Sequence, residues 1–180
     1  MTVEGCSLFD TAIGRCGIAW VDGKIAAVQL PEHDDVQTLA RLRRRAPAPQ
    51  RTPPASNQDV IDRLVALLDG EPVDLSGVEV ADEDLSDADR RVYAEARAIP
   101  PGKTLTYGDV AARVGSVGDA RAVGQAMGRN PFPIIVPCHR VVAADGALGG
   151  FSAGGGTETK RRMLVIEGAA VAPPTLFDRL

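Results

Sequence analysis

One run of nine residues constrains the fold of this chain more than any other: Ile134-Ile135-Val136-Pro137-Cys138-His139-Arg140-Val141-Val142. The apolar residues at its start predict a buried strand. Pro137 cannot donate a hydrogen bond to a strand ladder, so we expect the chain to bend there. Adjacent strand residues point to opposite faces, and Cys138 and His139 can therefore cooperate only beyond such a bend. The run predicts a rigid support that ends in a thiol, an imidazole and a guanidinium.

Two interpretations of Cys138 stay open at this point. A cysteine beside apolar residues is often a small buried hydrophobe at the end of a core strand. Alternatively, the His139 imidazole reaches the thiol directly or through one water, lowers its pKa and generates the thiolate, which is the nucleophilic form.

The composition is that of an ordinary protein with a hydrophobic core: 180 residues, 44% hydrophobic and 24% charged. No apolar stretch approaches the length of a membrane span and the first residues lack a signal-peptide pattern, so we expect no membrane association. Three cysteines at irregular spacing favour a reducing compartment, and we expect a cytoplasmic protein. Only His33 and His139 could join the cysteines in a zinc site, so we expect neither a metal nor a cofactor.

The net charge of -4 averages two unlike parts of the chain. Residues 1–100 carry 11 basic and 18 acidic side chains, a balance of -7, whereas residues 101–170 carry 8 and 5, a balance of +3. A positive surface on the second part could hold phosphates, because binding depends on the local field. Taken alone, an unevenly charged solvated surface is the simpler interpretation.

The first 86 residues predict a small antiparallel sheet with covering helices. Strands are expected at 6–9, 16–21 and 25–30, with Asp22-Gly23 as the tight turn between the last two. Helices are expected at 36–42 and 57–68, separated by a loop over 46–55 that contains four prolines. The arginine run 43–45 could contact phosphate, but a solvated end of the first helix is the favoured interpretation.

The acidic stretch 82–87 is the expected boundary to a second domain. We therefore divide the chain into domains at 1–86 and 87–170, with a tail at 171–180, and assign an α/β (α+β) fold class. Asp87 is expected to cap a helix that ends near residue 98. Helices at 107–114 and 119–128, joined by a turn over 115–118, form a helix-turn-helix candidate.

The last of these helices consists almost entirely of small residues, which let a helix approach another surface closely. Val123 and Met127 are expected to pack against the core. Arg121 has no obvious partner nearby and fits a side chain that reaches into DNA.

Four motifs in this order resemble the O6-alkylguanine-DNA alkyltransferases, also called methylated-DNA–protein-cysteine methyltransferases. The motifs are Ile99–Gly108, Ala120–Gly124, Asn130-Pro131 and Pro137–Val142. The resemblance covers residues 87–170, whereas the first 80 residues match the family only in size and in the turn Thr11-Ala12-Ile13-Gly14. It implies a ribonuclease H-like N-terminal domain and a winged helix-like helix-turn-helix domain that carries the cysteine.

The resemblance also implies an activity. An O6-alkylguanine, or an O4-alkylthymine, is flipped out of double-stranded DNA and its alkyl group is transferred to Cys138. The thioether product offers water no carbonyl to attack, so each protein molecule reacts once. We expect a monomer and leave cooperative binding along DNA open.

The resemblance assigns a role to each matching residue. His139 acts as the base for Cys138 through a water, Glu167 orients the imidazole, and Asn130 braces the turn. Tyr107 hydrogen-bonds the flipped purine and Arg121 fills the vacated stack. The implied DNA- and base-binding residues are Tyr107, Ala120, Arg121, Ala122, Met127, Pro133, Arg140, Val141, Phe151 and Ser152.

Two features depart from the family pattern. Phe151 stands where the family usually has tyrosine, and the glycine-rich stretch 152–159 is about two residues longer than usual. That stretch is either a simple flexible loop or a pocket lid that changes which alkyl groups fit.

Two other functions would use the same residues. A sensor would flip the damaged base without reacting, which the presence of Cys138 disfavours. A cysteine hydrolase would use Cys138, His139 and Glu167 on an acyl substrate, and it would need an oxyanion hole and turnover.

Overall fold

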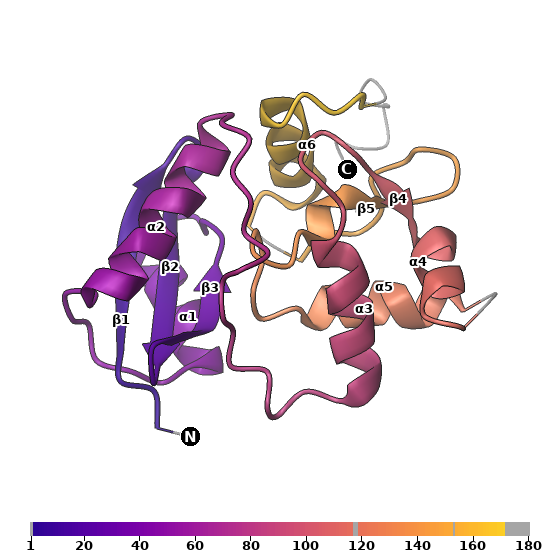
Figure 1. The fold of residues 1–180 in the computed structure, drawn as a ribbon. Helices are drawn as coiled ribbons and strands as arrows, with labels where there is room; N and C mark the ends of the chain where they lie inside the picture. Colours follow the sequence, from indigo (N-terminus) through magenta and orange to yellow (C-terminus); the bar gives the residue numbers. More distant parts are fainter. Residues whose placement is uncertain (1, 117–118, 153, 172–180) are drawn as a thin grey trace.

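The chain folds into two parts that lie side by side, a sheet with two helices and a second part built mainly of short helices (Figure 1). The computed structural model describes residues 2–116, 119–152 and 154–171. The expected mixed α/β class is confirmed. Within the described ranges, no helix is long and apolar enough to cross a membrane.

The sheet consists of three antiparallel strands in the order β1-β2-β3. Its strands are β1 (Gly5–Thr11), β2 (Gly14–Val21) and β3 (Lys24–Gln29). Asp22 and Gly23 both have positive φ, 49° and 77°, as a two-residue hairpin turn requires. All three expected strands and the expected turn are therefore confirmed.

Helices α1 (Asp35–Arg45) and α2 (Ala55–Leu68) cover opposite faces of this sheet (Figure 1). Successive strand residues point to opposite faces, so Ala19 packs with Leu42 of α1 whereas Ile18 faces the core that contains Leu64 of α2. The two N-terminal cysteines divide in the same way: Cys6 lies on the α1 side and Cys16 on the α2 side, both with no exposed surface.

The second part begins with α3 (Asp87–Arg97), continues through the short helices α4 (Tyr107–Arg113) and α5 (Ala120–Arg129), and ends with α6 (Gly156–Ile166). Two short strands, β4 (Leu105–Thr106) and β5 (Val141–Val142), pair in parallel. The cap of α3 is Ser86 rather than the expected Asp87, because the Ser86 hydroxyl accepts a hydrogen bond from the Asp89 N–H. The expected turn 115–118 and tail 171–180 lie partly outside the described residues, which exclude 117–118 and 172–180.

The strand expected before Pro137 is wrong. Ile134–Val136 form a buried turn in which Ile134 has a φ of 76° and the Val136 N–H donates to the carbonyl of Phe132 at 2.8 Å. The Asn130 side chain bonds the backbone at both ends of this turn, and it therefore satisfies polar groups that a sheet partner would otherwise have to bind. The expected bend at Pro137 is confirmed, because Pro137 precedes a 3-10 helix, η1 (Cys138–Arg140).

One hydrophobic core runs through both parts. Its buried members include Trp20 and Ile25 of the sheet and Tyr93, Val110 and Ile135 of the second part. The Val28 N–H of β3 also donates to the Pro131 carbonyl at 2.8 Å. The expected boundary at residues 86 and 87 falls directly before α3, but the division into two domains stays a prediction.

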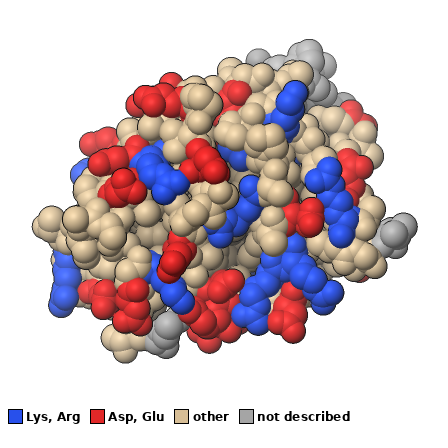
Figure 2. Space-filling view, in the orientation of Figure 1, with Lys and Arg blue, Asp and Glu red and all other residues tan. Residues whose placement is uncertain are grey.

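The charge difference between the two parts does not produce one positive and one negative region on the face shown in Figure 2. Acidic and basic side chains are interspersed over both parts of that face. The simpler interpretation of the sequence charge, an unevenly charged solvated surface, therefore fits this face.

Candidate active site

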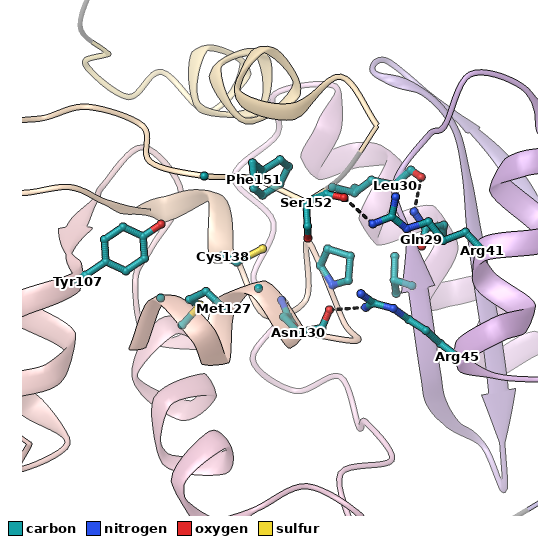
Figure 3. Close-up of a pocket in the computed structure, with 15 residues that line it drawn as sticks. Gln29, Leu30, Arg41, Arg45, Tyr107, Met127, Asn130, Cys138, Phe151 and Ser152 are labelled. Atoms are coloured by element: carbon teal, nitrogen blue, oxygen red, sulfur yellow. Dashed lines mark hydrogen bonds between the residues drawn. The ribbon is translucent and has the colours of Figure 1, made fainter. Parts of the chain in front are cut away.

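A cavity of about 380 Å³ opens where the two parts meet, and Cys138 forms part of its wall (Figure 3). The second part contributes Tyr107, Gly124, Met127, Gly128, Asn130, Pro133, Cys138, Gly150, Phe151 and Ser152. The N-terminal part contributes Val28, Gln29, Leu30, Arg41 and Arg45. The cavity is large enough for a small organic ligand or a single base.

Cys138 is held by the turn that precedes it. Its N–H donates to the Val136 carbonyl at 2.8 Å, and the residue is 8% exposed. Asn130 cross-links the same turn, because its Nδ2 donates to the Val136 carbonyl at 2.8 Å and its Oδ1 accepts from the Phe132 N–H at 2.9 Å. The thiol therefore sits on a rigid support, although that support is a turn and not a strand.

A buried charge network joins the two residues that follow Cys138 to Glu167. His139 Nε2 is 2.8 Å from Glu167 Oε1, and Arg140 donates to both carboxylate oxygens, from Nε at 3.0 Å and from Nη2 at 2.8 Å. Arg140 Nη1 also donates to the Ile99 carbonyl at 2.6 Å. Burial alone would raise the pKa of Glu167, but hydrogen bonds from His139 and Arg140 outweigh it and lower that pKa to about 2.

This network leaves one nitrogen of His139 free. Burial lowers the pKa of His139 despite the opposing effect of Glu167, so the imidazole is neutral at rest. With Nε2–H donated to Glu167, the other nitrogen, Nδ1, carries a lone pair. Among the described residues, Nδ1 is buried and has no hydrogen-bond partner. The imidazole is therefore prepared to accept a proton at Nδ1.

The Cys138 thiol is protonated at rest. Burial raises its pKa, while a hydrogen bond with the Asn130 side chain and the charge of Lys160 lower it without cancelling the effect of burial. Formation of a thiolate therefore requires a base such as His139.

Lys160 is a candidate site residue that the sequence patterns did not single out. It is 1% exposed, and its Nζ donates to the Val141 carbonyl at 2.6 Å and to the Tyr107 hydroxyl at 3.4 Å. The ammonium also lies 5.6 Å and 5.8 Å from the ring centroids of Tyr107 and Phe151. Burial lowers the pKa of Lys160 to about 8, against the opposite effect of Cys138. The signal was available, because Lys160 shares a helix face with Met163 and Leu164.

The structure brings together some of the expected DNA- and base-binding residues and separates others. Tyr107, Met127, Pro133, Phe151 and Ser152 line the cavity. Val141 is buried and its carbonyl is bound by Lys160.

The remaining members of the expected set lie outside the cavity lining. Ala120, Arg121 and Ala122 form the first turn of α5, where Arg121 and Ala122 are exposed. Arg140 is 5% exposed, and its guanidinium is occupied by Glu167 and the Ile99 carbonyl. The Arg140 geometry is that of a structural partner of Glu167 and not of a residue that faces DNA.

The arginine run at the end of α1 also contributes more than the sequence indicated. Arg43, Arg44 and Arg45 are all exposed, as expected for a solvated helix end. Arg45 nevertheless reaches the second part, because its Nη1 donates to the Asn130 carbonyl at 2.7 Å, and Arg41 Nη2 donates to the Ser152 carbonyl at 2.5 Å (Figure 3). No local pattern distinguishes Arg45 from Arg44, because the difference arises from the packing of α1 against the second part.

No group of three or more His, Cys, Asp or Glu side chains that could hold a metal ion occurs in the part of the chain that the structure describes. The groups around Cys138 are instead proton donors and acceptors, which suit chemistry at the sulfur.

Comparison with known proteins places these features in context. A family model described as "6-O-methylguanine DNA methyltransferase, DNA binding domain" matches residues 87–169. A Mycobacterium tuberculosis protein named methylated-DNA–protein-cysteine methyltransferase is 40% identical over 163 residues, covering 88% of this chain and 96% of the relative. A protein of the same name from Methanothermobacter thermautotrophicus is 35% identical over 155 residues, covering 86% and 80%.

Solved structures show the same similarity. Mycobacterium tuberculosis OGT in complex with DNA matches with a TM-score of 0.73 and 33% identity, covering 93% of each chain. The O6-methylguanine-DNA methyltransferase of Pyrococcus kodakaraensis matches with a TM-score of 0.71 and 28% identity, covering 93% of this chain and all of that one, 100%.

The fold and the supported thiol, with these similarities, define a class of protein, the DNA alkyltransferases that use a cysteine as acceptor. Within this class, the identities of 35% and 40% over most of the chain decide the family. The chain belongs to the methylated-DNA–protein-cysteine methyltransferases.

Proposed function

We propose that this protein repairs double-stranded DNA by moving the alkyl group of O6-alkylguanine irreversibly to its own Cys138. One observation carries the proposal. The Cys138 thiol, held on a rigid turn, lines a cavity of about 380 Å³, and the next residue, His139, has its Nε2 bound to the buried Glu167 carboxylate. Membership of the methyltransferase family supports it.

The reaction begins with deprotonation of the thiol. The Cys138 proton passes through one water to His139 Nδ1, the nitrogen without a partner among the described residues. Glu167 stabilises the resulting imidazolium through the 2.8 Å contact with Nε2. Arg140 holds the carboxylate in place, which is a positioning role and replaces the DNA contact that the family resemblance implies.

The thiolate then attacks the alkyl carbon, and the carbon–oxygen bond to the purine breaks. The electron pair goes to O6, and the purine takes up a proton. Burial, with a smaller effect of Cys138, raises the pKa of Tyr107, so its hydroxyl stays protonated and can donate to the purine. Lys160 donates to the same hydroxyl at 3.4 Å and strengthens it as a donor. The thioether has no hydrolysable bond, so the protein reacts once.

Access to the base requires extrusion from the duplex. Helices α4 and α5 pack together as the helical pair of a winged helix-like helix-turn-helix, with the small residues of α5 against the minor groove. Ala120 and Ala122 permit close approach, and the exposed Arg121 fills the vacated stack. Extrusion costs a few kcal/mol, least for a weakly paired damaged base. O4-alkylthymine is the second substrate of this pocket.

The remaining features of the proposal follow the family resemblance. The N-terminal part is ribonuclease H-like, the protein binds DNA as a monomer, and it acts in the cytoplasm. Val141 and Cys138 offer backbone carbonyls to the amino group of the base, and the Ser152 N–H binds the guanine oxygen.

The test is direct. The protein is mixed with a duplex that contains O6-methylguanine, and mass spectrometry follows the peptide that contains Cys138. We expect one methyl group on Cys138 in the wild type and none in Cys138→Ser. Tight binding without transfer would instead identify a sensor, and transfer that survives Cys138→Ser would disprove the assignment of the acceptor. Turnover of an acyl substrate, blocked by a thiol reagent, would favour a cysteine hydrolase.

A further inference from the structure

The cavity wall opposite the catalytic elements comes from the N-terminal part, and it is cationic. Arg41 and Arg45 extend from one face of α1 toward the second part and bind the carbonyls of Ser152 and Asn130 (Figure 3). Both residues line the cavity that Cys138 also lines. The reaction proposed above uses neither arginine.

The two arginines differ in how their charges are balanced. Arg41 Nη1 lies 2.8 Å from Glu32 Oε1, and this carboxylate compensates its charge. Arg45 has no carboxylate within salt-bridge distance among the described residues, and its hydrogen-bond partner is the neutral carbonyl of Asn130. Burial and the neighbouring Arg41 lower the pKa of Arg45, against the smaller opposite effects of Tyr93 and Cys138. The wall therefore presents one positive charge that no described carboxylate compensates.

This charge lies on the side of the cavity toward which the thiol points. In Figure 3 the Cys138 sulfur projects toward Ser152 and the N-terminal wall, and away from Tyr107. The substituent on a reacting alkyl carbon must occupy cavity space next to the sulfur. Ser152 borders that space, and Arg41 and Arg45 lie beyond it.

We propose that Arg45 adapts this pocket to O6-alkyl groups that carry a negative charge, of which carboxymethyl is the simplest. The proposal rests on the proposed alkyl transfer and names its preferred substrate class. The thiolate attacks the methylene carbon of the carboxymethyl group, the bond from that carbon to O6 breaks, and the electron pair leaves with O6. The thiol proton ends on the purine, and the products are guanine in DNA and S-carboxymethylcysteine at position 138.

The physical reason is charge repulsion at close range. A carboxylate one bond from the reacting carbon approaches a thiolate within a few ångströms, and a partly desolvated site increases their repulsion. A guanidinium beside the substituent offsets that repulsion and can donate two parallel hydrogen bonds to the carboxylate. A neutral substituent of the same shape gains neither effect.

The experiment compares two adducts within each protein. Duplexes carry either O6-carboxymethylguanine or O6-carbamoylmethylguanine, which has the same shape but no charge, and single-turnover transfer rates to Cys138 are measured. The readout is the transfer rate of the charged adduct divided by that of the neutral adduct. General effects on folding or DNA binding cancel in this ratio. We expect Arg45→Gln to lower this ratio roughly tenfold.

Three further variants sharpen the test. Arg44→Gln makes the same change one residue away at an exposed position outside the cavity, and it should keep the wild-type ratio. Arg45→Lys keeps the charge and should retain most of the preference. Ser152→Asp adds a carboxylate on the cavity wall and should lower the ratio without altering Arg45.

The outcomes separate this inference from the proposed function. A wild type that transfers methyl but not carboxymethyl, or an unchanged ratio in Arg45→Gln, overturns the role of Arg45 and leaves alkyl transfer intact. If Arg45→Gln does not fold, an unchanged ratio in Ser152→Asp overturns it. An equal fall of the ratio in Arg44→Gln also contradicts it, because the effect would then come from general surface charge. A wild type that transfers no methyl group disproves the proposed function itself.

Discussion

At the scale of single residues, Glu167 serves two partners whose contributions can be separated. It accepts from His139 Nε2 and pairs with the buried Arg140, and its side chain is 2% exposed. Glu167→Gln keeps an oxygen that can accept from His139 but removes the charge that stabilises the imidazolium. We expect methyl transfer to slow about 100-fold. We also expect a loss of about 3 kcal/mol of stability in urea unfolding, because Arg140 is left buried without a counter-charge.

The same residue predicts a pH dependence of stability. The pKa of Glu167 falls from 4.5 to about 2 on folding, so its contribution to stability is complete above pH 4.5 and is lost as the pH drops toward 2. The stability difference between wild type and Glu167→Gln should therefore shrink over this range. Glu158→Gln, which changes an exposed carboxylate of α6, serves as the control.

Lys160 predicts a second rise of stability with pH, this time at alkaline pH. Its pKa is lowered from 10.5 to about 8, so the unfolded chain binds the proton more strongly than the folded protein between these values. Wild type should gain stability relative to Lys160→Met as the pH rises from 8 to 10.5, by about 3 kcal/mol in total. Urea unfolding at a series of pH values measures this. A difference that stays constant, or an equal trend in the exposed Lys103→Met, would contradict the assignment.

At the scale of elements, the glycine-rich stretch before α6 packs closely against the N-terminal part and is not only a flexible loop. Helix α6 already begins at Gly156, so part of the expected loop 152–159 is helical; residue 153 lies outside the described part. A Cβ on Gly154 would come within 2.4 Å of the Pro31 carbonyl oxygen, which is backbone of the N-terminal part. The stretch therefore packs directly against the segment that follows β3.

This contact predicts the effect of one methyl group. Gly154→Ala should destabilise the protein by about 2 kcal/mol, because neither backbone can move aside easily. It should also weaken the bond between Arg41 and the Ser152 carbonyl. Gly77→Ala is the control, since a Cβ there meets nothing within 4 Å. Thermal unfolding measures both variants. Equal melting temperatures would show that the contact between Gly154 and Pro31 accommodates a methyl group.

At the scale of the whole molecule, one core shared by both parts predicts cooperative unfolding. The single tryptophan, Trp20, is 2% exposed in the sheet and reports on the N-terminal part by fluorescence. Far-UV circular dichroism is sensitive to helices, most of which lie in the second part. We expect the two signals to give coincident urea transitions. Separate midpoints would show that the two parts unfold independently, as the predicted division at residues 86 and 87 would allow.

The distance along the chain between interacting residues explains which features the sequence could predict. Local patterns were sufficient for the three strands of the sheet, for helices α1 to α5 and for the bend at Pro137, because each depends on nearby residues. They did not predict α6, whose first residues were expected to be a loop. The turn 134–136 was mistaken for a strand, because a short buried apolar run has no periodicity that separates the two. The roles of Arg45 and Arg140 depend on partners 85 and 27 residues away, which no local pattern reveals. The family resemblance supplied Glu167 and Tyr107, but not Lys160.

The burial of two cysteines on opposite sides of the sheet allows the unreacted protein in a preparation to be counted from its thiols. Cys6 and Cys16 have no exposed surface, and burial, although opposed by a hydrogen bond with Thr11, raises the pKa of Cys16 to about 12. A small thiol reagent applied to the native protein should therefore titrate Cys138 alone, whereas all three cysteines react after denaturation. Cys6 and Cys16 contribute two thiols per molecule that react only after denaturation, so half the difference between the denatured and native counts is the amount of protein. The native count divided by this amount gives the fraction of molecules whose acceptor is still unreacted. A preparation can thus be standardised before any DNA is added.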